Sequence, residues 1–198
     1  MAFSISHNAK HRDDNGKPHK LQDAAWFVTI LLLIHDEGLM QKRNMAVPAV
    51  YLILEREGKI LLARRFQTGY QDGNYNLPSG HVEDGELPIA AIIRESREEI
   101  GIDLREEDLK FVHASYRPPH DETGNRVDFF FHATKWSGEV VNAEPHKCDD
   151  LKWTSPQELP KNLTPHVQHV IGCVLRGEFF SELGIDFLKA NGVYTLSD

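Results

Sequence analysis

Three glutamates, Glu95, Glu98 and Glu99, stand three and four residues apart in a stretch with helical periodicity. These spacings place the three carboxylates on one side of an α-helix, within an arc of about 100°. Like charges so placed repel one another by a few tenths of a kcal/mol per pair. A hard divalent cation such as Mg²⁺ takes oxygen ligands and would convert that repulsion into coordination. The alternative is a solvated helix face on which Arg94 and Arg97 neutralise the acids.

The distribution of charge points to the same stretch. The chain has 198 residues and a net charge of −8. Residues 80–109 contain 3 basic and 10 acidic residues, so a local charge of −7 accounts for nearly the whole excess. An acidic chain argues against duplex nucleic acid as the main partner, because that binding depends on Lys and Arg at the phosphates.

The residues before the helix favour a metal site over a solvated face. The sequence reads Gly80-His-Val-Glu-Asp-Gly-Glu86, then seven residues, then Arg94-Glu95-Ser-Arg-Glu98-Glu99-Ile-Gly101-Ile102. This pattern resembles the box of the Nudix hydrolase family, in its MutT-like form, at every charged and glycine position. It departs from the family pattern at Ser96, where an apolar residue is usual, and at Leu87, where Ser or Thr often precedes the proline.

The resemblance implies a Mg²⁺ site, with Mn²⁺ as an alternative, held by the three helical glutamates and the backbone carbonyl of Gly80. It implies that Arg94 braces the loop against the helix through Glu86. It also implies that Glu98 combines metal binding with water activation. The catalytic residues implied in this way are Arg94, Glu95, Glu98 and Glu99.

Further residues are candidates for the base and for substrate contacts. Glu83, Glu122 and Glu144 are acidic groups outside the implied ligand set that could serve as the general base. The substrate-binding candidates are Arg64, Arg65, Tyr75 and His81. Each has a structural alternative, because arginines often cap hairpin ends, aromatic strand residues usually pack in the core, and a loop histidine is commonly exposed.

The resemblance implies hydrolysis of the pyrophosphate linkage of a nucleoside diphosphate derivative. The MutT-like closing stretch, residues 142–160, favours a nucleoside triphosphate, normal or oxidised, cut to monophosphate and pyrophosphate. Pro118, sixteen residues after Ile102, keeps ADP-ribose or a nucleotide sugar as an alternative substrate. Two different classes of protein compete with a hydrolase: an isopentenyl diphosphate isomerase, which requires a Cys–Glu pair, and a nucleotide-binding module without turnover. The intact glutamate set argues against both.

The hydrophobic pattern predicts the elements that position these residues. Apolar runs at 49–55 and 59–64, with a turn at Glu57-Gly58, predict a β-hairpin, followed by a loop at 67–79. Helices are predicted at 88–100, between Pro88 and Gly101, and at 165–176. Further strands are predicted at 111–116, 127–134 and 151–154. The expected fold class is α/β, a Nudix-type α/β/α sandwich with a mixed sheet between helices.

We expect an N-terminal extension at residues 1–45 and the Nudix domain at residues 46–198. The extension holds an apolar segment at 24–34, too short to span a bilayer, which needs about twenty residues. Translation from Met40 or Met45 is an alternative that would make the extension extraneous. Two cysteines indicate a cytoplasmic protein without a disulfide framework. The oligomeric state is open, a homodimer included.

Overall fold

The computed structural model describes residues 45–119 and 124–194 of the chain. The predicted extension, with its apolar segment at 24–34, therefore lies outside the described residues, and so does Glu122. The twelve elements that the structure assigns in the described part are β1 (Ala46–Arg56), β2 (Lys59–Arg65), β3 (Tyr75–Asn76), β4 (Ser79–His81), α2 (Pro88–Ile100), η2 (Glu106–Asp108), β5 (Lys110–Arg117), β6 (Asn125–Ala133), β7 (Cys148–Thr154), α3 (Pro165–Leu175), β8 (Phe180–Glu182) and α4 (Ile185–Ala190).

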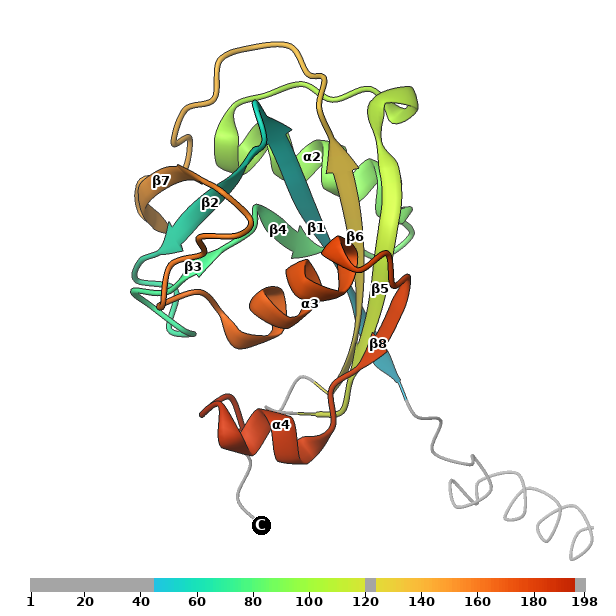
Figure 1. The fold of residues 1–198 in the computed structure, drawn as a ribbon. Coiled ribbons are helices and arrows are strands. Elements are labelled where there is room, and N and C mark those ends of the chain that lie inside the picture. The colour runs from blue at the N-terminus through green and yellow to red at the C-terminus, as the bar shows by residue number, and fades with distance from the viewer. Residues whose placement is uncertain (1–44, 120–123, 195–198) are drawn as a thin grey trace, which may run out of the picture. The chain divides into compact units, whose positions relative to one another are not determined.

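The strands form a mixed sheet in the order β3-β2-β1-β6-β5-β8, with β4 paired to β1 and β7 paired to β2. The β1–β2 hairpin is antiparallel, whereas β1 runs parallel to β6 over nine residue pairs. Helices α2 and α3 lie on opposite faces of this sheet (Figure 1). The predicted α/β sandwich with a mixed sheet between helices is therefore confirmed.

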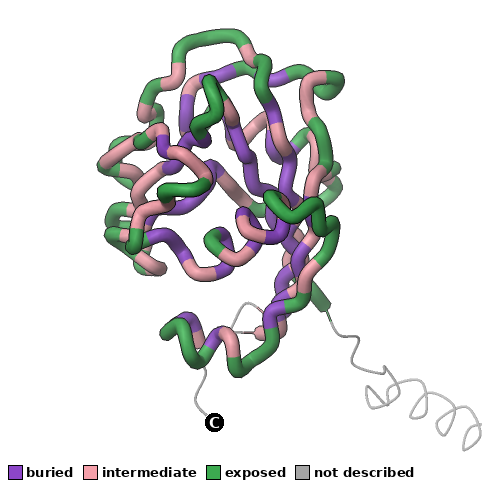
Figure 2. Tube along the Cα trace, viewed as in Figure 1, coloured by how far each residue is buried: buried purple, intermediate pink, exposed green. Residues whose placement is uncertain are grey.

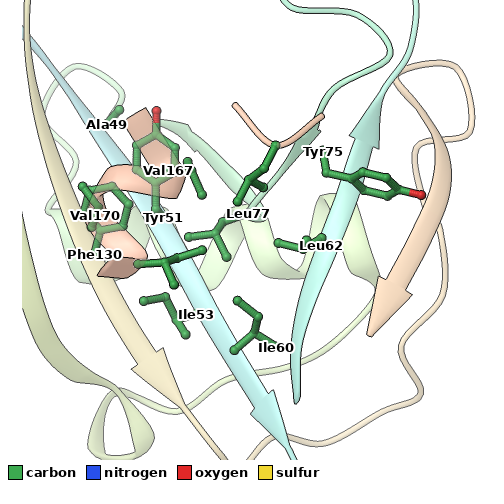
Figure 3. Packing of buried hydrophobic residues seen from close by; sticks show 12 residues of the cluster. Ala49, Tyr51, Ile53, Ile60, Leu62, Tyr75, Leu77, Phe130, Val167 and Val170 are labelled. Carbon is green, nitrogen blue, oxygen red and sulfur yellow. The ribbon is translucent and has the colours of Figure 1, made fainter. Parts of the chain in front are cut away.

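Strand β1 is the centre of the fold because both of its faces are buried. Its alternate residues Ala49, Tyr51 and Ile53 belong to the apolar cluster under α3, shown in Figure 3. The intervening Val50, Leu52 and Leu54 belong to the cluster under α2. An apolar run without alternation is what a strand covered on both sides requires. The buried positions in Figure 2 are accordingly concentrated in the central strands.

Helix α2 has the bounds that the sequence predicts, Pro88 to Ile100. Proline fits the first turn of a helix because the first amide groups have no partner inside it. Gly101 adopts the left-handed conformation, with φ of 69°, and its N–H bonds the carbonyls of Arg97 and Ser96. The Ser96 side chain is fully buried and donates to the Ile92 carbonyl at 2.6 Å. Its hydroxyl therefore has a partner within the helix.

The structure differs from the sequence prediction mainly in its shortest elements. The predicted loop at 67–79 contains β3 and the start of β4, and the sequence pattern predicts neither β8 nor α4. Strands of two or three residues are too short to show an alternating pattern, and pairing with distant strands creates them. In the described ranges, no helix is both long and apolar enough to cross a membrane.

The central position of β1 gives a test of the packing. We expect Leu52→Ala, at a fully buried site, to lower the free energy of unfolding by about 2–5 kcal/mol, because it removes buried methyl groups and leaves a cavity. Leu87→Ala makes the same substitution at a residue that is 73% exposed, and it should change stability by less than about 0.5 kcal/mol. Urea unfolding followed by circular dichroism measures both. Equal effects would contradict this description of the core.

Candidate active site

Arg94 is the centre of the hydrogen-bonded group that joins the loop before α2 to the helix itself. Its Nε and Nη2 both donate to the carboxylate of Glu86, each at 3.0 Å. Its Nη1 donates to Glu95 at 2.7 Å and to Glu98 at 3.2 Å, and Nη2 also reaches the carbonyl of His81 at 3.0 Å. The hydrogen bonds from Arg94 hold the pKa of Glu86 below its usual range. One guanidinium thus fixes the loop and two of the three predicted ligands.

Glu95 and Gly80 are in close contact across the gap between α2 and β4. A methyl group added at Gly80 would lie 1.9 Å from Glu95 Oε1, so only glycine leaves room for this carboxylate. Strand β4 is held in place by pairing with β1, in which Val50 is opposite Gly80. Burial raises the pKa of Glu95, although Arg94 acts in the opposite direction.

Glu99 is one helical turn further along and faces β4 as well. Its Oε2 accepts a hydrogen bond from the backbone N–H of Ser79 at 2.9 Å. Burial raises the pKa of Glu99 to about 8, and the neighbouring charges of Glu95 and Glu144 add to that effect. Burial and repulsion by neighbouring carboxylates thus both disfavour the anionic forms of Glu95 and Glu99, against the opposing effect of Arg94 and Arg65.

Glu98 is the most exposed of the three glutamates, with 53% of its side chain accessible. It accepts a hydrogen bond from Arg94, and it is not among the residues that line the cavity described below. Within residues 45–119 and 124–194, no three acidic, histidine or cysteine side chains are gathered into a preassembled metal cage. Glu95 and Glu99 line the cavity, whereas Glu98 lies on the same helix outside that lining.

A cavity of about 550 Å³ opens over these carboxylates. That volume is within the range of small-molecule sites. Its lining combines acids with basic groups: Glu83, Glu95, Glu99 and Glu144 with Arg64, Arg65, Arg94, Arg117, Arg126 and Lys147. Apolar and small polar residues complete the lining, among them Ala49, Tyr51, Leu77 and Ser79. Of the candidate bases, Glu83 and Glu144 line the cavity.

Three of the four predicted substrate contacts line this cavity. Arg64 forms an ion pair with Asp149 at 2.6 Å, and the Nε of Arg65 donates to the carbonyl of Tyr70 at 2.7 Å. His81 lines the cavity next to Gly80. Tyr75 does not line it: its ring packs in the apolar cluster under α3, and its hydroxyl bonds the carboxylate of Asp150.

Sequence reasoning missed Arg117 and its partner Asp128. Arg117 is 3% exposed and lines the cavity, and its Nε and Nη2 donate to the two oxygens of Asp128 at 2.8 and 3.0 Å. The signal was present in the sequence, because Asp128 is an acid inside the aromatic strand Val-Asp-Phe-Phe-Phe. A buried carboxylate of this kind requires a charged partner.

The residues present fit a divalent cation. Glu95 and Glu99 supply hard oxygen ligands, which Mg²⁺ prefers. The contact at Gly80 leaves the carboxylate of Glu95 in a space that any side chain would fill. The raised pKa values show that burial destabilises both carboxylates as anions. A cation bound between α2 and β4 would remove this electrostatic cost.

Comparisons with known proteins agree with this geometry. The family model described as NUDIX domain matches residues 42–172. The chain is 34% identical over 116 residues to the NAD-capped RNA hydrolase NudC of Pseudomonas putida, a match that covers 57% of this chain and 38% of that protein. It is 30% identical over 104 residues to the 8-oxo-dGTP diphosphatase of Proteus vulgaris, covering 52% of this chain and 88% of that protein.

Solved structures show the same fold. The MutT NUDIX hydrolase from Burkholderia pseudomallei superposes with a TM-score of 0.59 at 26% identity, over 65% of this chain and 97% of that one. The E. coli ORF135 protein superposes with a TM-score of 0.56 at 28% identity, over 66% and 89%. Because the family match covers well over half of the chain and includes the loop, the helix and the cavity, this chain belongs to the Nudix family.

Proposed function

We propose that this chain is a Mg²⁺-dependent pyrophosphohydrolase, with Mn²⁺ as an alternative metal, whose catalytic unit is residues 46–198. Its favoured substrate is a nucleoside triphosphate, normal or oxidised, which it cleaves to the monophosphate and pyrophosphate. The observation that carries the proposal is the cavity in which Glu95 and Glu99 lie beside Gly80 while Arg65 and Lys147 line the same space. One bound molecule could then contact both the carboxylates that would hold a metal ion and the basic side chains that would bind its phosphates.

Different residues would hold the cation, position the helix and bind the phosphates. Glu95, Glu98 and Glu99 would hold the cation, and Arg94 would keep their helix in place against the loop. A divalent cation, when bound, neutralises phosphoryl oxygens and lowers the pKa of water. Arg65 and Lys147 would bind the phosphate oxygens that remain. Together these contacts bring an activated water and an anionic phosphorus into one orientation, which removes much of the entropic barrier.

Glu144 is the candidate base that the geometry favours. It lines the cavity and lies close enough to Glu95 and Glu99 to raise the pKa of both. Lys147 Nζ donates to its carboxylate at 2.8 Å, which keeps the side chain in position. Glu98 is the alternative base, because the family resemblance gives it both roles.

The relatives support two substrate classes. The 8-oxo-dGTP diphosphatase of Proteus vulgaris, which this chain covers almost end to end, favours a triphosphate. The NAD-capped RNA hydrolase NudC of Pseudomonas putida favours a dinucleotide pyrophosphate, although the match covers only 38% of that protein. We therefore retain ADP-ribose, nucleotide sugars and related dinucleotides as the second candidate class. A non-catalytic nucleotide-binding module is the outcome that an activity test would have to exclude.

The direct test is a substrate panel with the products identified. We expect the purified protein with Mg²⁺ to cleave at least one nucleoside triphosphate and EDTA to abolish that activity, because the carboxylates alone repel a polyanion. Excess Mg²⁺ should restore it. Chromatography and mass spectrometry of the products show which phosphorus is attacked. Inactivity toward triphosphates, nucleotide sugars, dinucleoside polyphosphates and capped nucleotides would overturn the proposal.

Gly80→Ala tests the close contact with Glu95. The added methyl group would displace the Glu95 carboxylate, the flexible end of a side chain. We expect the melting temperature to change little while kcat falls roughly 100-fold, as for a misplacement of about 1 Å. The matched control is Gly184→Ala, where a methyl group meets no atom within 4 Å and φ is negative. Equal turnover in both variants would show that the contact is not functional.

Glu98→Gln separates a metal ligand from an exposed surface acid. The amide keeps the size of the side chain but removes its charge, so we expect turnover to fall by more than the roughly 10–100-fold lost when a residue behind a metal ligand is changed. Glu106→Gln is the control, because Glu106 is exposed on η2 and outside the cavity lining. Steady-state kinetics at saturating Mg²⁺ make the comparison. Near-normal turnover of the Glu98 variant would remove it from the ligand set.

A further inference from the structure

The cavity extends away from the acidic helix to an end that we call the β5 end, lined by Ala49 and Tyr51 of β1, Leu77 between β3 and β4, and Arg117 of β5. In the sheet, β1 and β6 separate β4 from β5. Three strand spacings of about 4.8 Å put the backbone of Arg117 about 14 Å from that of Gly80, while Ala49 and Tyr51 lie between them on β1, opposite His81 and Ser79. An extended nucleoside triphosphate spans a comparable distance. A substrate whose phosphates lie at Glu95 would therefore run across β1 and bring the edge of its base to Arg117.

The β1 part of the wall at the β5 end is aromatic and apolar. The ring of Tyr51 stacks on Phe130, with centroids 4.6 Å apart and planes at 14°. The hydroxyl of Tyr51 lies 3.3 Å from His166 Nε2, which fixes the ring at its other end. Figure 3 shows this hydroxyl pointing out of the apolar cluster near Ala49. Tyr51 is 7% exposed, so the cavity meets only the part of its ring that Phe130 and His166 leave uncovered, together with Ala49 and Leu77. This small apolar surface suits a base better than a phosphate.

Arg117 lines this end together with the polar residues Arg126 and His166, and Asp128 holds it side-on. Nε and Nη2 donate to the two carboxylate oxygens, and Ser115 donates to the same carboxylate at 3.1 Å. Both partners are almost completely buried, with 3% and 0% exposure. The charges of Arg117 and Asp128 cancel to a large extent, so this pair by itself adds little attraction for a phosphate.

The opposite edge of the guanidinium is available to a ligand. Side-on pairing uses Nε and one N–H of Nη2, which leaves the N–H groups of Nη1 and the second N–H of Nη2 as an adjacent pair of donors. Within the described residues, Arg117 makes no side-chain hydrogen bond besides those to Asp128. Two adjacent donors match two adjacent acceptors. Guanine presents such a pair in O6 and N7, whereas adenine presents N7 beside the N6 amino donor.

We propose that Arg117, oriented by Asp128, is the residue that selects guanine over adenine in the substrate. This inference rests on the proposed function, because it assigns the base of the same nucleotide whose phosphates are cleaved. Adenine would place its amino group against an N–H donor in a buried site, and the unpaired polar groups would weaken its binding.

Selectivity between dGTP and dATP tests the assignment. We expect the native chain to show a kcat/KM for dGTP at least tenfold above that for dATP. Arg117→Met combined with Asp128→Leu replaces both charged partners with apolar side chains, which avoids leaving one buried charge alone. In this double variant, the ratio of the two kcat/KM values should fall at least tenfold. An unchanged ratio in a folded double variant, or no guanine preference in the native chain, would overturn the assignment.

Two further variants keep the test interpretable. Arg117→Lys retains a positive charge for Asp128 but lacks the planar fork, so it should lower the ratio even if the double variant fails to fold. Arg97→Met combined with Asp103→Leu makes the same changes at an exposed pair, 61% and 60% accessible, outside the cavity lining. That control should keep the native ratio. A lysine variant with the native ratio would count against the role of the fork.

Binding of products distinguishes this inference from the proposed function. Calorimetry with GMP and AMP, without metal, reports on the base site whether or not the chain cleaves any substrate. Tighter binding of GMP that is lost in the Arg117 and Asp128 double variant supports the assignment even if the substrate panel shows no turnover. Equal affinity for the two, or no binding of either at millimolar concentration, overturns it even if triphosphates are cleaved.

Discussion

The site depends on one guanidinium that is shared among several acceptors. Arg94 bonds a glutamate in the loop, two glutamates on its own helix and a backbone carbonyl of β4. Without that positive charge, the acidic residues of α2 would repel both one another and the loop. The same group sets the position of Glu95, since Arg94 holds one carboxylate oxygen while Gly80 leaves room for the side chain. The loop, the helix and the sheet edge therefore form one electrostatic unit.

Strand β1 holds the loop, the helix and β4 in their relative positions. Strand β1 pairs with β4 on one edge and with β6 on the other, and a helix packs over each of its two faces. Pairing with β4 fixes Ser79 and Gly80 opposite Glu99 and Glu95. Pairing with β6 brings Asp128, and through it Arg117, to the far end of the cavity. The strand that stabilises the fold thus also sets the distance between the acidic residues and Arg117.

The helix and its acids were predictable from sequence because their determinants are local. Pro88, Gly101 and the spacing of the glutamates all lie within fifteen residues, and the helix has the predicted bounds. The β5 end was not predictable in this way. Arg117 and Asp128 are eleven residues apart and meet only because β5 and β6 pair in one particular register. Tyr75 shows the same limit, since the strand pattern did not decide whether its ring would face the cavity or the core.

The distribution of charge connects these observations to the nature of the substrate. The local charge of −7 in residues 80–109 would repel a polyanion if it were spread over a solvated face. In the fold, Arg94 neutralises part of it, and burial raises the pKa values of Glu95 and Glu99. A cation bound there would reverse the sign of the field that the phosphates meet. Asp128 neutralises Arg117, so Arg117 adds hydrogen-bond donors but little net positive charge. It therefore distinguishes substrates by hydrogen bonding, while a cation held by the acidic residues would attract their phosphates.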